Sequence, residues 1–255
     1  MPLDIVTIPC LADNYAYLLH CRETGQVAVV DVPEAAPILA ALKERDWPLH
    51  MILVTHHHSD HIQGVDELRE KTGAVVLGAK ADEHRLPKLD VAFNEDDSFA
   101  VGSEIGEVID VSGHTVGHIA FHFPNADIVF SADSLMALGC GRIFEGTQPM
   151  MWKSLQKFME MRPETLVYSG HEYTASNAKF ALTIEPDNQA LQKRAADIDA
   201  TRAAGGFTVP ASIELELATN PFLRADLPEV KELLGMADAS DAEVFGEIRT
   251  RKDNF

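Results

Sequence analysis

The segment 55–61, which reads THHHSDH, gathers side chains that bind metal ions. His56 and His58 are two residues apart, so in an extended loop they project to the same side. Asp60 and His61 follow where the loop turns into a helix, and they can face a second position nearby. Imidazole with carboxylate suits zinc, iron or manganese, and the segment has no cysteine, which disfavours a closed structural zinc site. The segment therefore predicts an open metal site.

Three further candidate ligands lie at the expected ends of later strands. They are His114 in SGHTVGH, Asp133 in FSADSL and His171 in YSGHEYT. Each carries little weight by itself, because a lone histidine is more often structural than a ligand. Their order, and the small residue or turn beside each one, make the set informative. The alternative, a fortuitous histidine-rich tract, is disfavoured because the first run follows a buried strand, contains an acid and lies away from both termini.

Three other histidines are assigned roles outside the set of ligands. His57 lies between two candidate ligands and points the opposite way, so we expect it to pack or to form a hydrogen bond. His118 lies four residues after the candidate ligand His114. We expect it to have a structural role or to support the site without binding a metal. His84 stands between Glu83 and Arg85 and is expected at the surface.

The elements that must position these residues alternate between strands and helices in the first half of the chain. Runs at 4–9, 16–21 and 26–31 are rich in β-formers and separated by turn signals, which predicts a meander. The next expected elements are a helix, a strand, a helix closed by Gly73 and a strand, at 35–46, 51–55, 65–72 and 74–78. The metal motif thus follows the carboxyl end of a strand, where α/β proteins place their sites.

The second half begins with strands and then becomes helical. Strands are expected at 107–111, 119–123, 128–131 and 165–169, with a helix at 152–161. From Thr174 onward the pattern is helical, except for an ambiguous run at 212–217. These changes predict a catalytic domain over 1–172 and a smaller helical domain over 173–255.

The composition of the chain disfavours several classes of binding partner. The chain has 40 acidic and 21 basic residues and a net charge of −19, so its surface repels nucleic acid. No run approaches the roughly 18 apolar residues of a membrane span, and the N-terminus lacks a secretory pattern. Three cysteines without CxxC spacing fit free thiols in a reducing compartment. We therefore expect a cytoplasmic protein, monomeric, with no nucleic-acid or membrane partner.

One local basic cluster stands out against this acidic background. Arg249, Arg251 and Lys252 lie within four residues near the C-terminus. Composition leaves two interpretations open: a solvated last helix turn whose cations suit the negative end of the helix dipole, or an anion-binding site.

The ligand pattern resembles the signature of the metallo-β-lactamase superfamily, THxHxDH followed by a histidine, an aspartate and a histidine. The resemblance covers about residues 1–172. It implies an α/β fold, the αββα metallo-β-lactamase sandwich, with a binuclear site at one edge. It further implies that His56, His58 and His114 hold the first metal and that Asp60, His61 and His171 hold the second. Asp133 would bridge the two ions, and Asp60 and Asp133 would be the carboxylates that serve catalysis.

Two such ions explain the residue types. Divalent cations about 3.5–4 Å apart share a water whose pKa falls toward neutrality, giving a hydroxide that attacks an acyl carbon or phosphorus centre. Five neutral imidazoles and two carboxylates leave two dications with net positive charge, which stabilises the developing oxyanion. No protein nucleophile is needed, so Ser59 and Cys140 are assigned none of this chemistry. Zinc is the expected metal, with iron and manganese as alternatives.

Over almost its whole length the chain resembles the glyoxalase II family, the hydroxyacylglutathione hydrolases. The matching segments are LADNYAYLL at 11–19, GCGRIFEGT at 139–147, GHEYT at 170–174, TNPFLR at 219–224 and RTRKD at 249–253. A helical C-terminal domain is also a feature of that family. The family's glutathione-binding positions fall on Arg142, Phe144, Tyr173, Arg249 and Lys252.

These binding assignments have alternatives and one departure. Cations suit the two carboxylates of glutathione. Phe144 replaces a tyrosine found in some members, so one hydroxyl contact should be absent. Arg142 could instead only pair with Glu145, and Tyr173 could belong to the core.

The resemblance implies hydrolysis of S-(2-hydroxyacyl)glutathione, typically S-D-lactoylglutathione, to D-lactate and glutathione. A thiolate leaves without a strong general acid, and none is evident beyond the metals. Two alternatives remain: another hydrolase of the superfamily, such as a lactonase, β-lactamase or nuclease, or a non-catalytic metal-binding protein. The acidic surface and the C-terminal motif disfavour the first, and the complete ligand set disfavours the second.

Overall fold

The computed structural model describes residues 3–255, which form two compact units. The first unit comprises the chain up to Val111 together with Val116–Ala132. The second comprises Ser112–Thr115 and Asp133–Phe255. The division of function at 172/173 stays a prediction.

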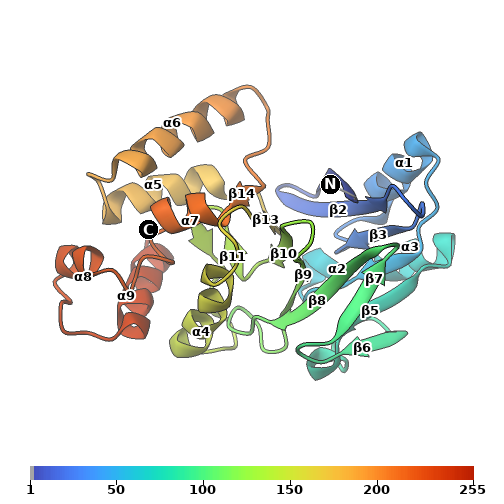
Figure 1. The fold of residues 1–255 in the computed structure, drawn as a ribbon, viewed down its shortest axis with the longest axis horizontal. Helices are drawn as coiled ribbons and strands as arrows, with labels where there is room; N and C mark the ends of the chain where they lie inside the picture. The colour runs from blue at the N-terminus through green and yellow to red at the C-terminus, as the bar shows by residue number, and fades with distance from the viewer. Residues whose placement is uncertain (1–2) are drawn as a thin grey trace. The chain divides into compact units, whose positions relative to one another are not determined.

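A six-stranded sheet in the first unit carries the beginning of the chain (Figure 1). Its strands, in spatial order, are β1 (Leu3–Cys10), β2 (Asn14–Cys21), β3 (Val27–Val30), β4 (Met51–Leu53), β5 (Val75–Ala79) and β6 (Val91–Phe93). The first three are antiparallel neighbours, which confirms the predicted meander. From β3 to β6 the neighbours are parallel. The carboxyl ends of these parallel strands therefore meet at one edge.

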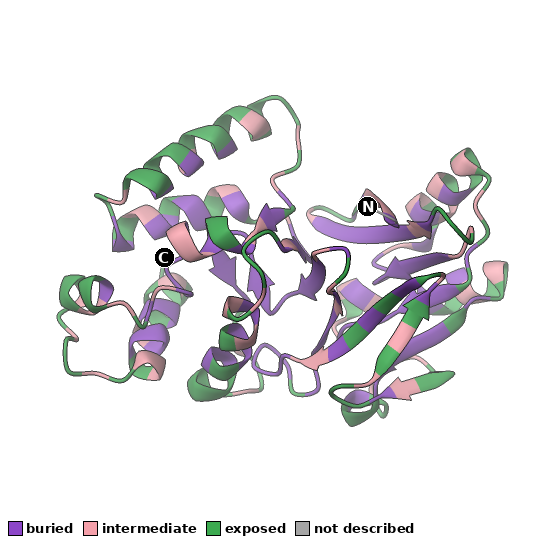
Figure 2. Cartoon of the chain, viewed as in Figure 1, coloured by how far each residue is buried: buried purple, intermediate pink, exposed green. Residues whose placement is uncertain are grey.

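An antiparallel group of four strands forms the other layer of this unit. They are β7 (Ser98–Val101), β8 (Glu104–Asp110), β9 (Ile119–Phe123) and β10 (Ile128–Ala132). Aromatic pairs join the layers: Tyr17 of β2 lies 5.5 Å from Phe130 of β10, and Phe93 of β6 lies 5.5 Å from Phe99 of β7, between ring centres. The strands β3, β4 and β10 are buried along their whole length (Figure 2). This apolar core holds the strand ends rigidly.

The helices of the first unit follow the parallel strands. They are α1 (Ala35–Arg45), α2 (Ser59–Ile62), α3 (Val65–Thr72) and the 3₁₀ turn Lys80–Asp82. Helix α1 packs against β1 and α3 through a buried face that includes Ile38 and Leu42. Helix α3 has the predicted bounds and ends where Gly73 adopts the left-handed conformation, φ 73°. That conformation favours glycine because it has no Cβ.

The second unit is mainly helical, with two short strand pairs. Its strands are β11 (Leu135–Met136), β12 (Gly139–Cys140), β13 (Leu166–Ser169) and β14 (Ala211–Ser212), paired β11–β12 and β13–β14. Its helices are α4 (Gln148–Met159), α5 (Thr174–Ile184), α6 (Gln189–Ala203), α7 (Ile213–Thr219), α8 (Pro228–Leu234) and α9 (Asp241–Asp253). Helices α5 and α6 share a cluster of Ala178, Ala181, Leu191 and Ile198.

Two sequence predictions are refined by helix starts in this unit. Helix α4 begins at Gln148, four residues before the expected start, because the Thr147 side chain caps the amide of Met150. The ambiguous run at 212–217 is mostly helical: Ser212 ends the two-residue strand β14 and caps the amide of Leu215, and α7 begins at Ile213. In both places an N-capping side chain, and not the apolar pattern, sets the residue at which the helix begins.

Two findings concern cysteines and membranes. Cys10, Cys21 and Cys140 are free and buried. Within residues 3–255, no helix combines the length and apolar character needed to cross a membrane.

Candidate metal centre and binding residues

A buried carboxylate, Asp31, organises the metal motif in the first unit. Asp31 follows β3, and residues 55–61 follow its parallel neighbour β4. The Asp31 carboxylate accepts hydrogen bonds from the Thr55 amide at 2.9 Å and the Thr55 hydroxyl at 2.8 Å. Its Oδ2 also lies 2.8 Å from Nδ1 of His61. One acid thus holds both ends of the loop that carries the motif.

These bonds decide which ring nitrogens can bind a metal. A carboxylate only accepts, so His61 carries its proton on Nδ1 and its lone pair on Nε2. The Thr55 hydroxyl donates to Asp31 and therefore accepts from Nδ1 of His56 at 3.0 Å, which leaves the His56 lone pair on Nε2 as well. Both histidines are buried and oriented with Nε2 available to a metal, in the way outer carboxylates commonly support metal sites.

The remaining residues of the loop are also held in place. Nδ2 of the buried Asn14 donates to both the carbonyl and the Oδ2 of Asp60, each at 3.0 Å. Nδ1 of His57 lies 2.9 Å from Oδ2 of Asp82, which is fully buried and also accepts from Arg85. The prediction that His57 hydrogen-bonds away from the ligands is confirmed.

His118 and His84 differ in burial as expected. The His118 ring is fully buried and stacks on that of His56, with ring centres 4.5 Å apart and planes 14° from parallel. It therefore supports the position of His56. His84 is exposed.

The carboxylate of Asp133, in the second unit, lies between two candidate ligands. Its Oδ2 is 3.5 Å from Nε2 of His114 and 3.2 Å from Nε2 of His171. All three side chains are buried. Nδ1 of His114 lies 2.7 Å from the carbonyl oxygen of Arg142, which can only accept, so the His114 lone pair is on Nε2, facing Asp133. One oxygen of Asp133 thus lies within 3.5 Å of an imidazole nitrogen of each of two candidate ligands.

The backbone is strained beside both acids. Asp31 has φ 57°, and Ala132, directly before Asp133, has φ 42°. Left-handed conformations are costly for residues other than glycine and persist where the surroundings enforce them. Glycine is required at position 141 for a steric reason. A Cβ there would overlap the carbonyl oxygen of Asp133 and lie 2.9 Å from Nδ1 of His114. Close backbone packing therefore sets the positions of His114 and Asp133.

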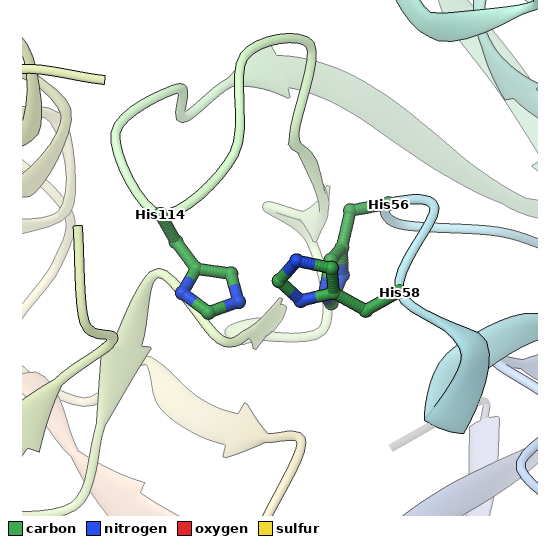
Figure 3. A group of neighbouring side chains, drawn as sticks. All are labelled: His56, His58 and His114. Carbon is green, nitrogen blue, oxygen red and sulfur yellow. The ribbon is translucent and has the colours of Figure 1, made fainter. Parts of the chain in front are cut away.

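Three groups of side chains have ligand atoms within 4.8 Å of one another. One is His56, His58 and His114, which Figure 3 draws as sticks. The others are Asp60, His61 and His171, and Asp31, His56 and His61. The first two contain the residues expected for the first and second ions. The donor set of oriented neutral imidazoles and carboxylates fits zinc, iron or manganese, whereas the identity and number of ions stay predictions.

Replacing Asp31 with asparagine should weaken metal binding about 10- to 100-fold, as losses of outer-shell partners do. The asparagine amide cannot accept at both oxygen positions, so the orientation of His56 or His61 is lost. Competition with a chromophoric chelator measures the affinity. Asp66→Asn, an exposed residue of α3, is the control. Equal affinities in both variants would contradict the role assigned to Asp31.

Two aromatic residues contact the candidate ligands of the second unit. The Tyr173 ring stacks on that of His171, with centres 4.6 Å apart, and it is 39% exposed. The Phe144 ring meets that of His114 edge-on at 5.4 Å and is 60% exposed. The interpretation of Tyr173 as a core residue is therefore wrong. Both rings offer an accessible surface beside a metal ligand.

The arginines have unequal surroundings. Arg142 is exposed and forms an ion pair with Asp253, Nε to Oδ1 at 3.2 Å, where the sequence left Glu145 as the alternative partner. Arg249 is buried: Nη1 donates to the Cys140 carbonyl at 2.9 Å and Nη2 to Asp253 at 2.9 Å. The interpretation of the basic cluster as a solvated helix turn is thus wrong for Arg249, because α9 turns this face inward.

Lys252 is half-buried between aromatic rings. Its Nζ donates to the Ser176 carbonyl at 3.3 Å and lies 5.2 Å from the Phe180 ring centre and 5.3 Å from that of Phe255. Burial, together with the charge of Arg249, lowers the pKa of Lys252 to about 8. Burial has the opposite effect on Cys140, because it raises the pKa of the thiol to about 11. Cys140 is therefore held as a neutral thiol, in agreement with its exclusion as a nucleophile.

Sequence reasoning missed four residues that support the site. Asp31 ends a β-rich run beside the metal motif, and an acid in that place was a signal of its role. Asn14, Asp82 and Asp253 offered no comparable signal, because their partners lie far away in the sequence.

Comparison with known proteins agrees with this geometry. The metallo-β-lactamase superfamily model matches residues 14–171, and the model described as the hydroxyacylglutathione hydrolase C-terminus matches residues 172–255. A hydroxyacylglutathione hydrolase of Cereibacter sphaeroides is 60% identical over 255 residues, covering 100% of both chains.

Two solved structures share the fold. ETHE1 from Myxococcus xanthus superposes with a TM-score of 0.68 at 25% identity, over 98% of this chain and 90% of that one. TTHA1623, solved in a di-iron-bound form, has a TM-score of 0.62 at 25% identity, over 86% of this chain and 100% of its own. The predicted fold class, with its C-terminal helical region, is confirmed. The chain therefore belongs to the hydroxyacylglutathione hydrolase family of the metallo-β-lactamase superfamily and is a hydrolase of glutathione thioesters.

Proposed function

We propose that the chain hydrolyses S-(2-hydroxyacyl)glutathione, typically S-D-lactoylglutathione, to D-lactate and glutathione, using two divalent metal ions. His56, His58 and His114 would hold the first ion, Asp60, His61 and His171 the second, and Asp133 both. Zinc is proposed as the metal. Iron and manganese accept the same donors, and the di-iron form of TTHA1623 supports iron as an alternative.

The observation that carries this proposal is the direct contact between candidate metal ligands and candidate substrate residues. Tyr173 stacks on His171, and Phe144 touches His114. The carbonyl of Arg142, the next candidate, accepts from the ring of His114. A ligand held by the side chains of these three residues would have its reactive end beside the metal ligands.

The side chains divide the work of binding. Arg142 and Lys252 supply cations for the glutathione carboxylates, and the Tyr173 hydroxyl can donate to the peptide. Arg249 is proposed to contribute through its charge and by holding the Cys140 carbonyl. Phe144 offers an apolar edge without a hydroxyl. We propose the division of these roles between a catalytic domain, 1–172, and a glutathione-binding domain, 173–255, which the spans of the two family models support.

In the proposed reaction, the main task of the protein is to orient the side chains that hold the metal ions. Bound dications would lower the pKa of a shared water and stabilise negative charge on the thioester carbonyl oxygen. The hydrogen bonds that Nδ1 of His56, His61 and His114 donates fix the orientation of these rings and leave Nε2 as the nitrogen available to a metal. Water that has given up a proton to solvent would add its oxygen to the acyl carbon. The carbon–sulfur bond would then break as the carbonyl re-forms, and the departing thiolate would take a proton from solvent.

Metal analysis with kinetics tests the proposal. We expect close to two ions per chain, loss of turnover after chelation, and recovery when zinc is restored. S-D-lactoylglutathione should be hydrolysed far better than the lactoyl thioester of N-acetylcysteamine, which lacks the peptide. Full activity at one ion per chain would refute the binuclear site. Equal turnover of both thioesters would refute the glutathione preference.

The cytoplasmic location and monomeric state expected from the composition, and the absence of a nucleic-acid partner, are also proposed here. The net charge of −19 supports the last. Sedimentation of the purified chain would decide the oligomeric state.

A further inference from the structure

The carboxylate of Asp253, at the end of α9, joins two of the residues proposed to bind glutathione. Its Oδ1 accepts from Nη2 of Arg249 at 2.9 Å and lies 3.2 Å from Nε of Arg142. A carboxylate between two guanidinium groups occupies the kind of position that a ligand carboxylate would take.

The two arginines are not equally able to exchange partners. Arg249 is buried, donates to the Cys140 carbonyl at 2.9 Å and lies over the Phe222 ring at 5.1 Å, so its place is set by packing. The side chain of Arg142 is 57% exposed and that of Asp253 is 37% exposed. Exposed ion pairs contribute little net stability, because water solvates both charges when they separate. The Arg142–Asp253 pair is therefore the one that a ligand can displace.

From this asymmetry we infer that Asp253 is a residue that limits the affinity for glutathione, because it holds Arg142 until a carboxylate of the ligand replaces it. The inference rests on the proposed glutathione substrate. A ligand with a carboxylate in reach of Arg142 recovers the ion pair that it breaks. A ligand without one meets an arginine that is already neutralised and gains nothing from it. Asp253 thus lowers the affinity for every ligand whose carboxylate pairs with Arg142.

The exchange leaves the metal ligands in place. Arg142 contacts His114 through its backbone carbonyl, which accepts from the His114 ring. Arg249 holds the neighbouring Cys140 carbonyl at the same time. Motion of the Arg142 side chain therefore changes ligand binding, and so KM, but not the orientation of His114.

Asp253→Asn tests the inference, because the amide oxygen can still accept from Arg249 while the charge is lost. We expect glutathione to bind about twofold to fivefold more tightly by calorimetry, with KM for S-D-lactoylglutathione lower by a similar factor and kcat unchanged. Glutathione diethyl ester, which lacks both carboxylates, should bind wild type and variant equally. Asp253→Ser, with a shorter neutral side chain, provides a second measurement of the same gain.

Glu247→Gln is the matched control. It removes one negative charge from the same helix, where Glu247 pairs with Arg251 at 2.8 Å, away from Arg142. We expect its glutathione affinity to equal that of wild type. The gain from Asp253→Asn should also vanish in an Arg142→Met background.

Distinct outcomes would overturn the inference. Weaker glutathione binding by Asp253→Asn would mean that Asp253 pre-organises Arg142. Equal gains in Asp253→Asn and Glu247→Gln would reduce the effect to net charge. Unchanged affinity in the variant, with normal glutathione binding by wild type, would refute the inference alone. Failure of wild type to bind glutathione would refute the proposed function and, with it, the inference.

Discussion

Asp133→Ala is expected to lose one of the two proposed metal ions and to lower kcat at least about 10²-fold. The physical reason is the position of its Oδ2, 3.5 Å from Nε2 of His114 and 3.2 Å from that of His171. Removing this oxygen leaves two cations less screened from each other and deletes a ligand that both would share. Metal content by mass spectrometry and steady-state turnover of S-D-lactoylglutathione measure the two effects.

Two controls separate loss of the ligand from loss of the fold. Glu164→Ala removes a carboxylate that is 68% exposed in the same unit, and it should keep full metal content and turnover. The melting temperature of metal-free Asp133→Ala should be no lower than that of metal-free wild type, because burying an acid without its ion is unfavourable. A folded Asp133→Ala protein with normal turnover would refute the bridging role.

Lys252→Met should raise KM for S-D-lactoylglutathione about tenfold, with a smaller change in kcat. Methionine keeps the apolar contacts with Phe180 and Phe255 while removing the cation. The variant would lose a charge-assisted hydrogen bond to a glutathione carboxylate. Because the side chain is partly exposed, solvent screening makes the free energy of this bond smaller than that of a buried one. Because this contact is nearly the same in the ground and transition states, its loss should fall mainly on KM.

The wild-type KM should also depend on pH. Burial lowers the pKa of Lys252 to about 8, so the free protein loses this cation as the pH rises through 8. KM should therefore be lowest below pH 8 and rise above it. Lys252→Met should show the higher KM throughout, without that rise. Titration of the substrate is common to both proteins and cancels in the comparison.

Arg251→Met is the matched control for Lys252. Arg251 is the preceding cation, exposed and paired with Glu247, and its loss should leave KM unchanged. If Lys252→Met and Arg251→Met behave alike, the effect is one of general charge, and Lys252 is not a contact. Arg249 is less suitable for this test, because truncating a buried guanidinium would also disturb Cys140 and Asp253.

The local pattern of the chain was sufficient to identify the metal motif and the elements around it. The alternation of β-formers and turn signals predicted β1–β3, and the apolar period with its closing glycine predicted α3 to the residue. These signals are readable because strand pleating, helix period and capping are set by neighbours in the sequence. The ligand types and their order in 55–61 were informative for the same reason.

Tertiary structure alone decided how the charged groups around the site are partnered. Asp31 reaches His61 across 30 residues of sequence, and Arg249 reaches the Cys140 carbonyl across 109. The helix period places Arg249 on the same face of α9 as Phe245, away from Arg251, but only the packing of α9 determines which partners Arg249 meets on that face. The sequence did not determine the partner of Arg142 for the same reason. Glu145 is near in sequence, yet the fold brings Asp253 to Arg142. Long-range pairing depends on how whole elements pack, and no pattern within one element encodes that packing.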